Sequence, residues 1–128
     1  MSDFSYGPHL TIDAYGCDKA RLGSLDCAFE LLHDLPGRIG MVRITQPYVF
    51  PYAASDPRDG GVTGFVVIAE SHISVHTYPE RGVVFVDVFS CRPFDTDAAK
   101  ALICEAFGAS GQVDSNVVRR GVRFHQEG

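Results

Sequence analysis

"VTGFVVIAESHISVHTYPERGVVFVDVFS", residues 62–90, contains three closely spaced strand candidates and decides the fold. Residues 62–69, 72–78 and 82–90 are short runs rich in Val, Ile and Phe, which is typical of strands. Alternate residues of the last run share a face, and both faces are largely apolar: Val84, Val86 and Val88 on one, and Val83, Phe85, Asp87 and Phe89 on the other. A strand that is apolar on both faces predicts cover on both sides of its sheet.

The rest of the chain adds two helices and further strands to this sheet. Periodicity predicts strands over 9–15, 39–50 and 113–124, helices over 18–34 and 96–108, and a loop over 52–61, with Pro36-Gly37 ending the first helix. We therefore predict an α+β two-layer sandwich, an antiparallel sheet with two helices on one face. Two helices cover only one face. The other apolar face predicts a homodimer, with two sheets packed in a four-layer αββα arrangement.

Length and composition indicate one soluble domain over residues 1–128, of 13.9 kDa, with 45% hydrophobic and 21% charged residues. The apolar runs are shorter than the ~18 residues that span a membrane, and the first ten residues do not resemble a signal peptide. We expect a cytoplasmic protein. The net charge of −5 and the scattered basic residues, clustered only at Arg119, Arg120 and Arg123, argue against nucleic acid or an anionic membrane as a partner.

The four cysteines form no C-x-x-C pair, so a zinc ribbon or a thioredoxin-like site is not supported. Cys17, Cys27 and Cys104 are interpreted as small buried apolar residues. Cys91 differs because it ends a predicted strand.

Polar residues interrupt the apolar run at "IAESHISVHTYPE", residues 68–80. Unpaired polar groups are costly to bury, so the presence of so many polar residues in one predicted strand region needs an explanation. Strand alternation places His72, Ser74 and His76 on one face. The simplest interpretation is a partly exposed face on which water and neighbouring hydroxyls satisfy the histidines.

Two chemical alternatives remain for this segment. His72 and His76 could bind zinc with Glu70 or Cys91, but on a strand the two histidines lie roughly 13 Å apart, too far for shared ligation. Cys91 could instead form a nucleophilic Cys-His pair, which requires an orienting group and an oxyanion hole that the sequence does not reveal.

A family resemblance explains most of the cluster. "ESHISVHTYPE" (70–80) and "VDVFSC" (86–91) resemble the S-adenosylmethionine decarboxylase family of short bacterial and archaeal type, with its pattern E-S-H-x-(S/T)-x-H-T-x-P-E followed by D-x-F-(T/S)-C. "GPHLTIDAYGCD" (7–18) is similar to the start of that family. The resemblance runs from about residue 7 to residue 91.

The resemblance implies a self-processing proenzyme. The Ser71 hydroxyl would attack the Glu70 carbonyl, and elimination would split the chain between Glu70 and Ser71 into a β chain (1–70) and an α chain (71–128). The former Ser71 would become a pyruvoyl group. His76 matches the histidine that assists processing, and Thr63 matches a helper serine of the family.

The implied activity is decarboxylation of S-adenosylmethionine for spermidine synthesis. The substrate amine would form a Schiff base with the pyruvoyl group, which acts as an electron sink without pyridoxal phosphate or a metal. Cys91 matches the proton donor. Glu80 matches the residue that binds the substrate ribose, and Phe50 is nearest to the phenylalanine that stacks on the adenine.

The chain departs from the family at the loop over 52–61, which is several residues longer. Some relatives decarboxylate arginine or ornithine with the same chemistry, and Asp56 or Asp59 in this loop could bind such a cationic side chain. A non-catalytic dimeric domain that keeps the motif without processing is the remaining alternative.

Overall fold

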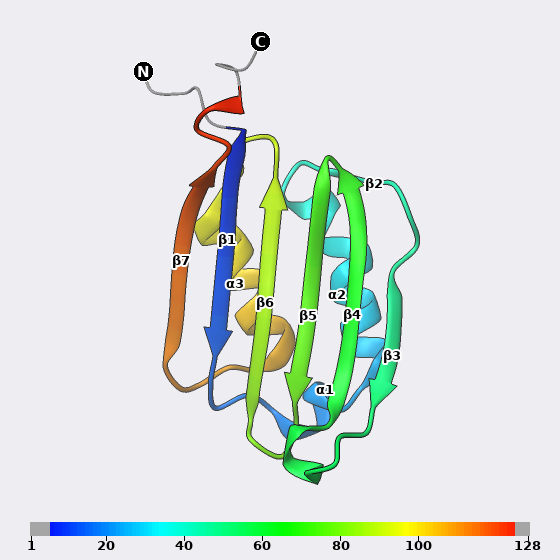
Figure 1. The fold of residues 1–128 in the computed structure, drawn as a ribbon. Coiled ribbons are helices and arrows are strands. Elements are labelled where there is room, and N and C mark those ends of the chain that lie inside the picture. Colours follow the sequence, from blue (N-terminus) through cyan, green and yellow to red (C-terminus); the bar gives the residue numbers. More distant parts are fainter. Residues whose placement is uncertain (1–5, 125–128) are drawn as a thin grey trace.

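The computed structural model describes residues 6–124, which form one antiparallel sheet with helices against one face (Figure 1). The strand order is β2-β4-β5-β6-β1-β7, and β3 also pairs with β4. The strands are β1 (Gly7–Ala14), β2 (Val42–Arg43), β3 (Tyr48–Tyr52), β4 (Gly61–Ala69), β5 (Ser71–Tyr78), β6 (Val83–Ser90) and β7 (Val113–Arg120). The predicted α+β class and antiparallel sheet are confirmed.

Helix α2 (Leu25–Arg38) lies against the half of the sheet that contains β4 and β5 (Figure 1). The Ser24 hydroxyl accepts a hydrogen bond from the Cys27 N–H and caps its first turn. Its apolar stripe, with Leu31, Leu32 and Leu35, is buried.

Helix α3 (Thr96–Phe107) packs against β1 and α2. The Asp95 carboxylate caps its first turn, and Gly108, with φ +62°, ends it in the left-handed conformation that glycine adopts without strain. Ala99, Ile103 and Phe107 recur every four residues and are buried, so the helix turns one continuous apolar stripe toward the sheet.

The helix predicted over 18–34 differs in two ways. It is two helices, because Gly23 and Ser24 separate α1 (Lys19–Leu22) from α2. The predicted end at Pro36-Gly37 is also wrong, since α2 continues to Arg38. Pro36 lies in the last turn, where the Ile39 N–H still donates to the Leu35 carbonyl at 3.2 Å.

The strand predicted over 39–50 is divided into β2 and β3, which both pair with β4. The N–H groups of Ile44 and Thr45 both point to the Val67 carbonyl, at 2.8 and 3.4 Å, so two residues oppose one as in a β-bulge. The last strand ends at Arg120 rather than at 124, because Gly121 has φ +67°.

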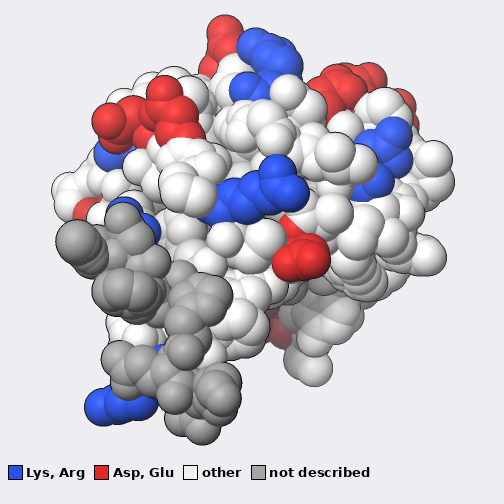
Figure 2. Space-filling view, turned by 90° about the horizontal axis from the view of Figure 1, so that it is seen from above, with Lys and Arg blue, Asp and Glu red and all other residues white. Residues whose placement is uncertain are grey.

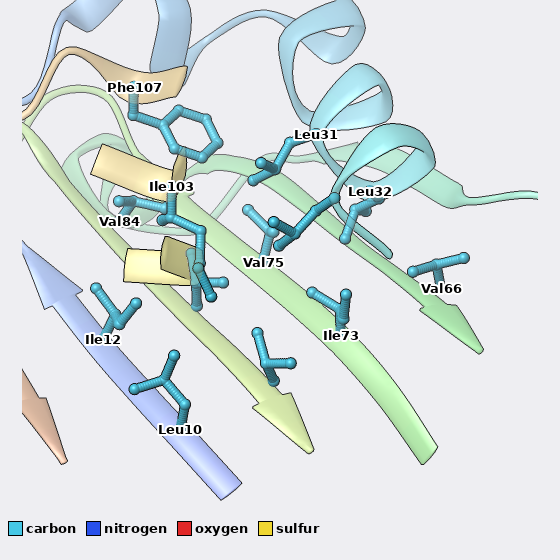
Figure 3. Close-up of a cluster of buried hydrophobic side chains, with 14 of the residues drawn as sticks. Leu10, Ile12, Leu31, Leu32, Val66, Ile73, Val75, Val84, Ile103 and Phe107 are labelled. Atoms are coloured by element: carbon cyan, nitrogen blue, oxygen red, sulfur yellow. The ribbon is translucent and has the colours of Figure 1, made fainter. Parts of the chain in front are cut away.

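The hydrophobic core lies between the helices and one face of the sheet (Figure 3). Alternate residues of the central strands point into it, and the close-up shows them facing the helices: Leu10, Ile12, Val66, Ile73, Val75 and Val84 opposite Leu31, Leu32, Ile103 and Phe107. All ten are buried. The core therefore accounts for only one of the two apolar faces seen in the sequence.

Within the described residues, no helix covers the opposite face of the sheet, which we call the open face (Figure 1). It exposes large apolar side chains, among them Phe65 at 39%, Phe85 at 40%, Tyr48 at 50% and Phe50 at 48%. Seen from the end of the sheet at which β1 begins and β7 ends, acidic and basic residues are interspersed (Figure 2). Within residues 6–124, no helix is long and apolar enough to span a membrane.

Replacing Leu32 by Ala should lower the free energy of unfolding by about 2–5 kcal/mol, because the side chain is fully buried between α2 and the sheet. The control is Leu25→Ala on the same helix, where the side chain is 43% exposed and the loss should stay below about 1 kcal/mol. Urea titration of the two variants measures both values; equal losses would contradict the assigned face of α2.

Candidate functional site

The connection between β4 and β5 carries the first group of site residues. Ser71 begins β5 directly after Glu70, and it lies in register with Ile68 of β4 and Ser90 of β6. Its φ of +117° is a conformation that residues with side chains rarely adopt. Such conformations cost about 1–3 kcal/mol and are concentrated at functional sites. Ser71 is thus held in a strained backbone at the bond where cleavage is predicted.

Cys91 lies next to that bond. It follows the last residue of β6, and its backbone N–H donates to the Glu70 carbonyl oxygen at 3.3 Å. An N–H group in this position would stabilise negative charge on that oxygen during attack by a hydroxyl. The structure therefore brings Glu70, Ser71 and Cys91 together and supplies a main-chain donor that the sequence did not reveal.

Gly7 allows the end of β6 to approach β1 closely. A Cβ atom at Gly7 would lie 1.9 Å from the Ser90 carbonyl oxygen and 2.9 Å from the Cys91 Cα. A side chain there would displace the backbone that holds Cys91. The sequence shows Gly7 only as part of the family resemblance, because its contact with Ser90 and Cys91 depends on the pairing of β1 with β6.

The other cysteines have a different environment. Cys17, Cys27 and Cys104 all pack against the hydrophobic core. Burial raises the pKa of each thiol above its ordinary value. These three thiols are partly buried rather than fully buried as predicted, which leaves Cys91 as the cysteine beside the bond between Glu70 and Ser71.

Thr63 and His76 form a second group on the open face. They are paired across β4 and β5, and the Thr63 Oγ1 lies 3.4 Å from the His76 Nδ1. Phe50 of β3 is opposite Thr63, and Phe85 of β6 is opposite His76. The pairing fulfils the geometric requirement for Thr63 and His76 to act together.

The two groups are distant from each other within one chain. His76 is five residues from Ser71 along an extended strand, which corresponds to about 16 Å at ~3.3 Å per residue. The two groups therefore cannot meet within a single protomer.

A third cluster joins β1, β5 and β6 on the open face. The Asp87 Oδ2 lies 2.6 Å from the His9 Nε2 and 3.0 Å from the His72 Nε2, and the Ser74 hydroxyl donates to Oδ1. Burial tends to raise the pKa of Asp87, but the hydrogen bonds from Ser74, His9 and His72 outweigh it and hold the pKa below its ordinary value. The cluster thus surrounds an ionised carboxylate.

This cluster differs from the metal set considered from sequence. Ligand atoms of His9, His72 and Asp87 lie within 4.8 Å of one another, whereas His76 is four strand residues away from His72. The imidazole nitrogens of His9 and His72 already bond to Asp87, and the Arg120 guanidinium lies 3.3 Å from the His9 Nδ1. The Arg120 guanidinium is a cation next to the cluster, and the Nε2 atoms of both histidines are already paired with Asp87. We therefore interpret the cluster as a hydrogen-bond network rather than as a set of metal ligands.

The long loop over 52–61 borders a hollow of about 930 Å³ at the other end of the open face, lined by Tyr52, Tyr78 and Phe85 among others. Both acids of the loop are ion-paired, Asp56 with Arg58 at 2.7 Å and Asp59 with Arg81 at 2.8 Å. Their carboxylates therefore already have cationic partners.

Glu80 lies in the turn after β5. Its carboxylate forms an exposed ion pair with Lys19, with 2.9 Å between the Lys19 Nζ and the Glu80 Oε2. Phe50 lies opposite Thr63 in the sheet, whereas Glu80 is four residues beyond His76, in the turn after β5.

Comparison with known proteins gives a consistent picture. Residues 8–121 match the family model described as S-adenosylmethionine decarboxylase. S-adenosylmethionine decarboxylase proenzymes of Thermococcus gammatolerans and Acidithiobacillus ferrooxidans are 33% and 35% identical over 117 and 120 residues, each covering 91% of this chain and 77% and 84% of the relative. That of Pyrococcus abyssi is 34% identical over 94% of this chain and 83% of its own length.

The fold agrees with this similarity. The crystal structure of the adenosylmethionine decarboxylase from Aquifex aeolicus superposes with a TM-score of 0.76 at 30% identity, over 91% of this chain and 92% of the other. The similarity therefore extends beyond the segment around Glu70 and Ser71 to most of the chain.

Proposed function

The chain belongs to the S-adenosylmethionine decarboxylase family, and we propose that it is a self-processing, pyruvoyl-dependent S-adenosylmethionine decarboxylase whose product serves spermidine synthesis. The observation that carries this proposal is the hydrogen bond from the Cys91 N–H to the carbonyl of Glu70, beside the strained Ser71. The names of the relatives support this substrate rather than arginine or ornithine. The ion pairs of Asp56 and Asp59 agree with that choice.

Cleavage follows from the residues at this bond. The Ser71 Oγ attacks the Glu70 carbonyl carbon, and the Cys91 N–H stabilises the oxyanion while the amide becomes an ester. Loss of the Ser71 α-proton then breaks the Cβ–Oγ bond, which leaves Glu70 as a carboxylate and residue 71 as dehydroalanine. Water replaces the nitrogen, ammonia leaves, and a ketone remains at the start of the α chain.

Once formed, the pyruvoyl ketone supplies an electron sink that lets a bound α-amino acid lose its carboxylate. The backbone of Cys91 lies beside the bond that precedes residue 71. We assign the Cys91 thiol as the proton donor after CO2 leaves. The free cysteines of the described chain fit a reducing compartment such as the cytoplasm.

Processing requires Thr63 and His76 of a second protomer. A hydroxyl needs a base to become a nucleophile, yet this pair lies about 16 Å along β5 from Ser71 of the same chain. If two open faces pack around a two-fold axis that runs across the strands, the Ser71 end of one sheet meets the Thr63–His76 region of the other. The exposed aromatics of the open face support a homodimer of this kind.

Substrate contacts are assigned to Phe50 and Glu80. Phe50 is 48% exposed and lies opposite Thr63, where a ring can stack on an adenine. The Glu80 carboxylate can accept hydrogen bonds from the ribose hydroxyls once it exchanges Lys19 for the substrate.

Purified protein should contain two chains of about 7.6 and 6.3 kDa, by proportion of the 13.9 kDa total, ending at Glu70 and beginning at the former Ser71. Ser71→Ala should stay intact because no hydroxyl remains to attack. Cys91→Ala keeps its backbone N–H, so it should be cleaved while its CO2 release from S-adenosylmethionine falls about a hundredfold or more.

Denaturing mass spectrometry and release of labelled CO2 measure these outcomes. Arginine and ornithine serve as comparison substrates and should release none. Efficient cleavage of Ser71→Ala at the same bond would refute the acyl shift, and CO2 from arginine or ornithine alone would refute the substrate.

A mixing experiment tests whether the site is shared between protomers. Chains with Ser71→Ala or His76→Ala should each remain uncleaved when expressed alone. When both are expressed together, the His76→Ala chain should be cleaved, because it keeps Ser71 and receives the imidazole from its partner. If neither chain is cleaved in a co-purified heterodimer, His76 does not act across the interface.

Glu80→Gln should raise the KM for S-adenosylmethionine at least about tenfold, the effect of losing hydrogen bonds to a charged group. Lys19→Ala is the matched control: it removes the ion pair but keeps the carboxylate, so its KM should not rise. Steady-state kinetics of both processed variants decide the question, and equal increases in KM would mean that Glu80 acts only through Lys19.

A further inference from the structure

We propose that Asp87, through the imidazole of His72, anchors the pyruvoyl end of the α chain after the chain is cut. His72 would thereby be a positioning residue for decarboxylation and not for cleavage. This inference rests on the proposed function, because it concerns the new end that cleavage at Ser71 creates.

Cleavage changes how residue 71 is held. In the intact chain, Ser71 is fixed on one side by its bond to Glu70 and on the other by β5. Cutting removes the first attachment and also the nitrogen of residue 71. His72 then becomes the first residue of the α chain that retains a backbone N–H and a side chain with a fixed partner.

The His72 side chain has such a partner within reach. Its Nε2 lies 3.0 Å from the Asp87 Oδ2, and its ring lies edge-on to His9 and Phe89, with centroids 6.0 and 5.9 Å apart. Hydrogen bonds to an ionised acceptor, such as the Asp87 carboxylate, are roughly twice as strong as hydrogen bonds between neutral groups. The imidazole is therefore fixed in position and in ring orientation.

Asp87 is itself well placed to serve as an anchor. It lies in β6, which pairs with β5 on one side and β1 on the other, so its position does not depend on the cut segment. The Ser74 hydroxyl and the His9 imidazole hold the carboxylate from two neighbouring strands. Residues of three strands thus converge on the Asp87 carboxylate, and one of them, His72, directly follows the reactive residue.

Only decarboxylation needs this anchor. Cleavage occurs while the chain still holds Ser71 from both sides. Turnover requires the ketone at the free end to stay aligned with the bound substrate and the proton donor. Loss of this alignment lowers the rate of decarboxylation.

The experiment compares His72→Ala, His72→Gln and Ser74→Ala. We expect His72→Ala to cleave at nearly the rate of the unsubstituted protein while its kcat, counted per pyruvoyl group, falls about tenfold or more. His72→Gln keeps an N–H donor and should recover much of the kcat. Ser74→Ala removes one bond to the Asp87 carboxylate but leaves the bonds from His9 and His72, so its kcat should fall much less than that of His72→Ala.

Hydrogen exchange of the first α-chain peptide provides a direct second readout. Its amides should exchange faster in cleaved His72→Ala than in the cleaved unsubstituted protein. In the uncleavable Ser71→Ala background, adding His72→Ala should leave the exchange of the same amides nearly unchanged, because the chain still holds them.

The anchor is refuted if His72→Ala slows cleavage as much as turnover, if it changes neither, or if Ser74→Ala lowers kcat equally. It is also refuted if exchange rises equally in the cleaved and uncleavable backgrounds. An unsubstituted protein that stays intact would refute the proposed function together with the anchor, and mass spectrometry distinguishes that result from a failure of the anchor alone.

Discussion

The site depends on the hydrogen bond from the Cys91 N–H to the Glu70 carbonyl, which joins the end of β6 to the turn between β4 and β5. This contact exists because β5 and β6 pair with Ser71 opposite Ser90, so the residue after β6 comes to lie beside the bond before β5. A shift of register by one residue would exchange the faces of every side chain in the strand. The same pairing that buries Ile73, Val75 and Val88 therefore also positions the groups of the proposed cleavage site.

One face of the sheet contributes the hydrophobic core, and the other carries most of the candidate functional side chains. The face toward α2 and α3 is filled by buried aliphatic side chains, which make the main hydrophobic contribution to folding. The open face combines exposed aromatics with the polar groups of Thr63, His76 and the Asp87 cluster. Polar side chains remain available for reaction because the core does not require that face.

Sequence alone predicted the strands over 62–90 and the α+β class well, because short runs rich in Val, Ile and Phe that are bounded by polar or turn residues are a strong local signal. The sequence did not predict element boundaries that tertiary contacts determine, such as the bulge at Ile44 and Thr45 and the continuation of α2 past Pro36 to Arg38. Motif spacing located the candidate residues, but not their partners. Gly7 approaches Ser90, and His9 bonds to Asp87, across about eighty residues of sequence. No local sequence pattern encodes contacts between residues so far apart.

The location of the predicted cut also has a physical reason. A break inside a strand would leave two loose ends within the sheet, whereas the bond between Glu70 and Ser71 lies where β4 ends and β5 begins. After cleavage, β4 and β5 still pair from Thr63 opposite His76 to Val67 opposite His72, and β5 still pairs with β6 from His72 to Tyr78. The two chains thus remain one folded unit. Only the new end loses support, and the fold places its polar network one residue away from that end.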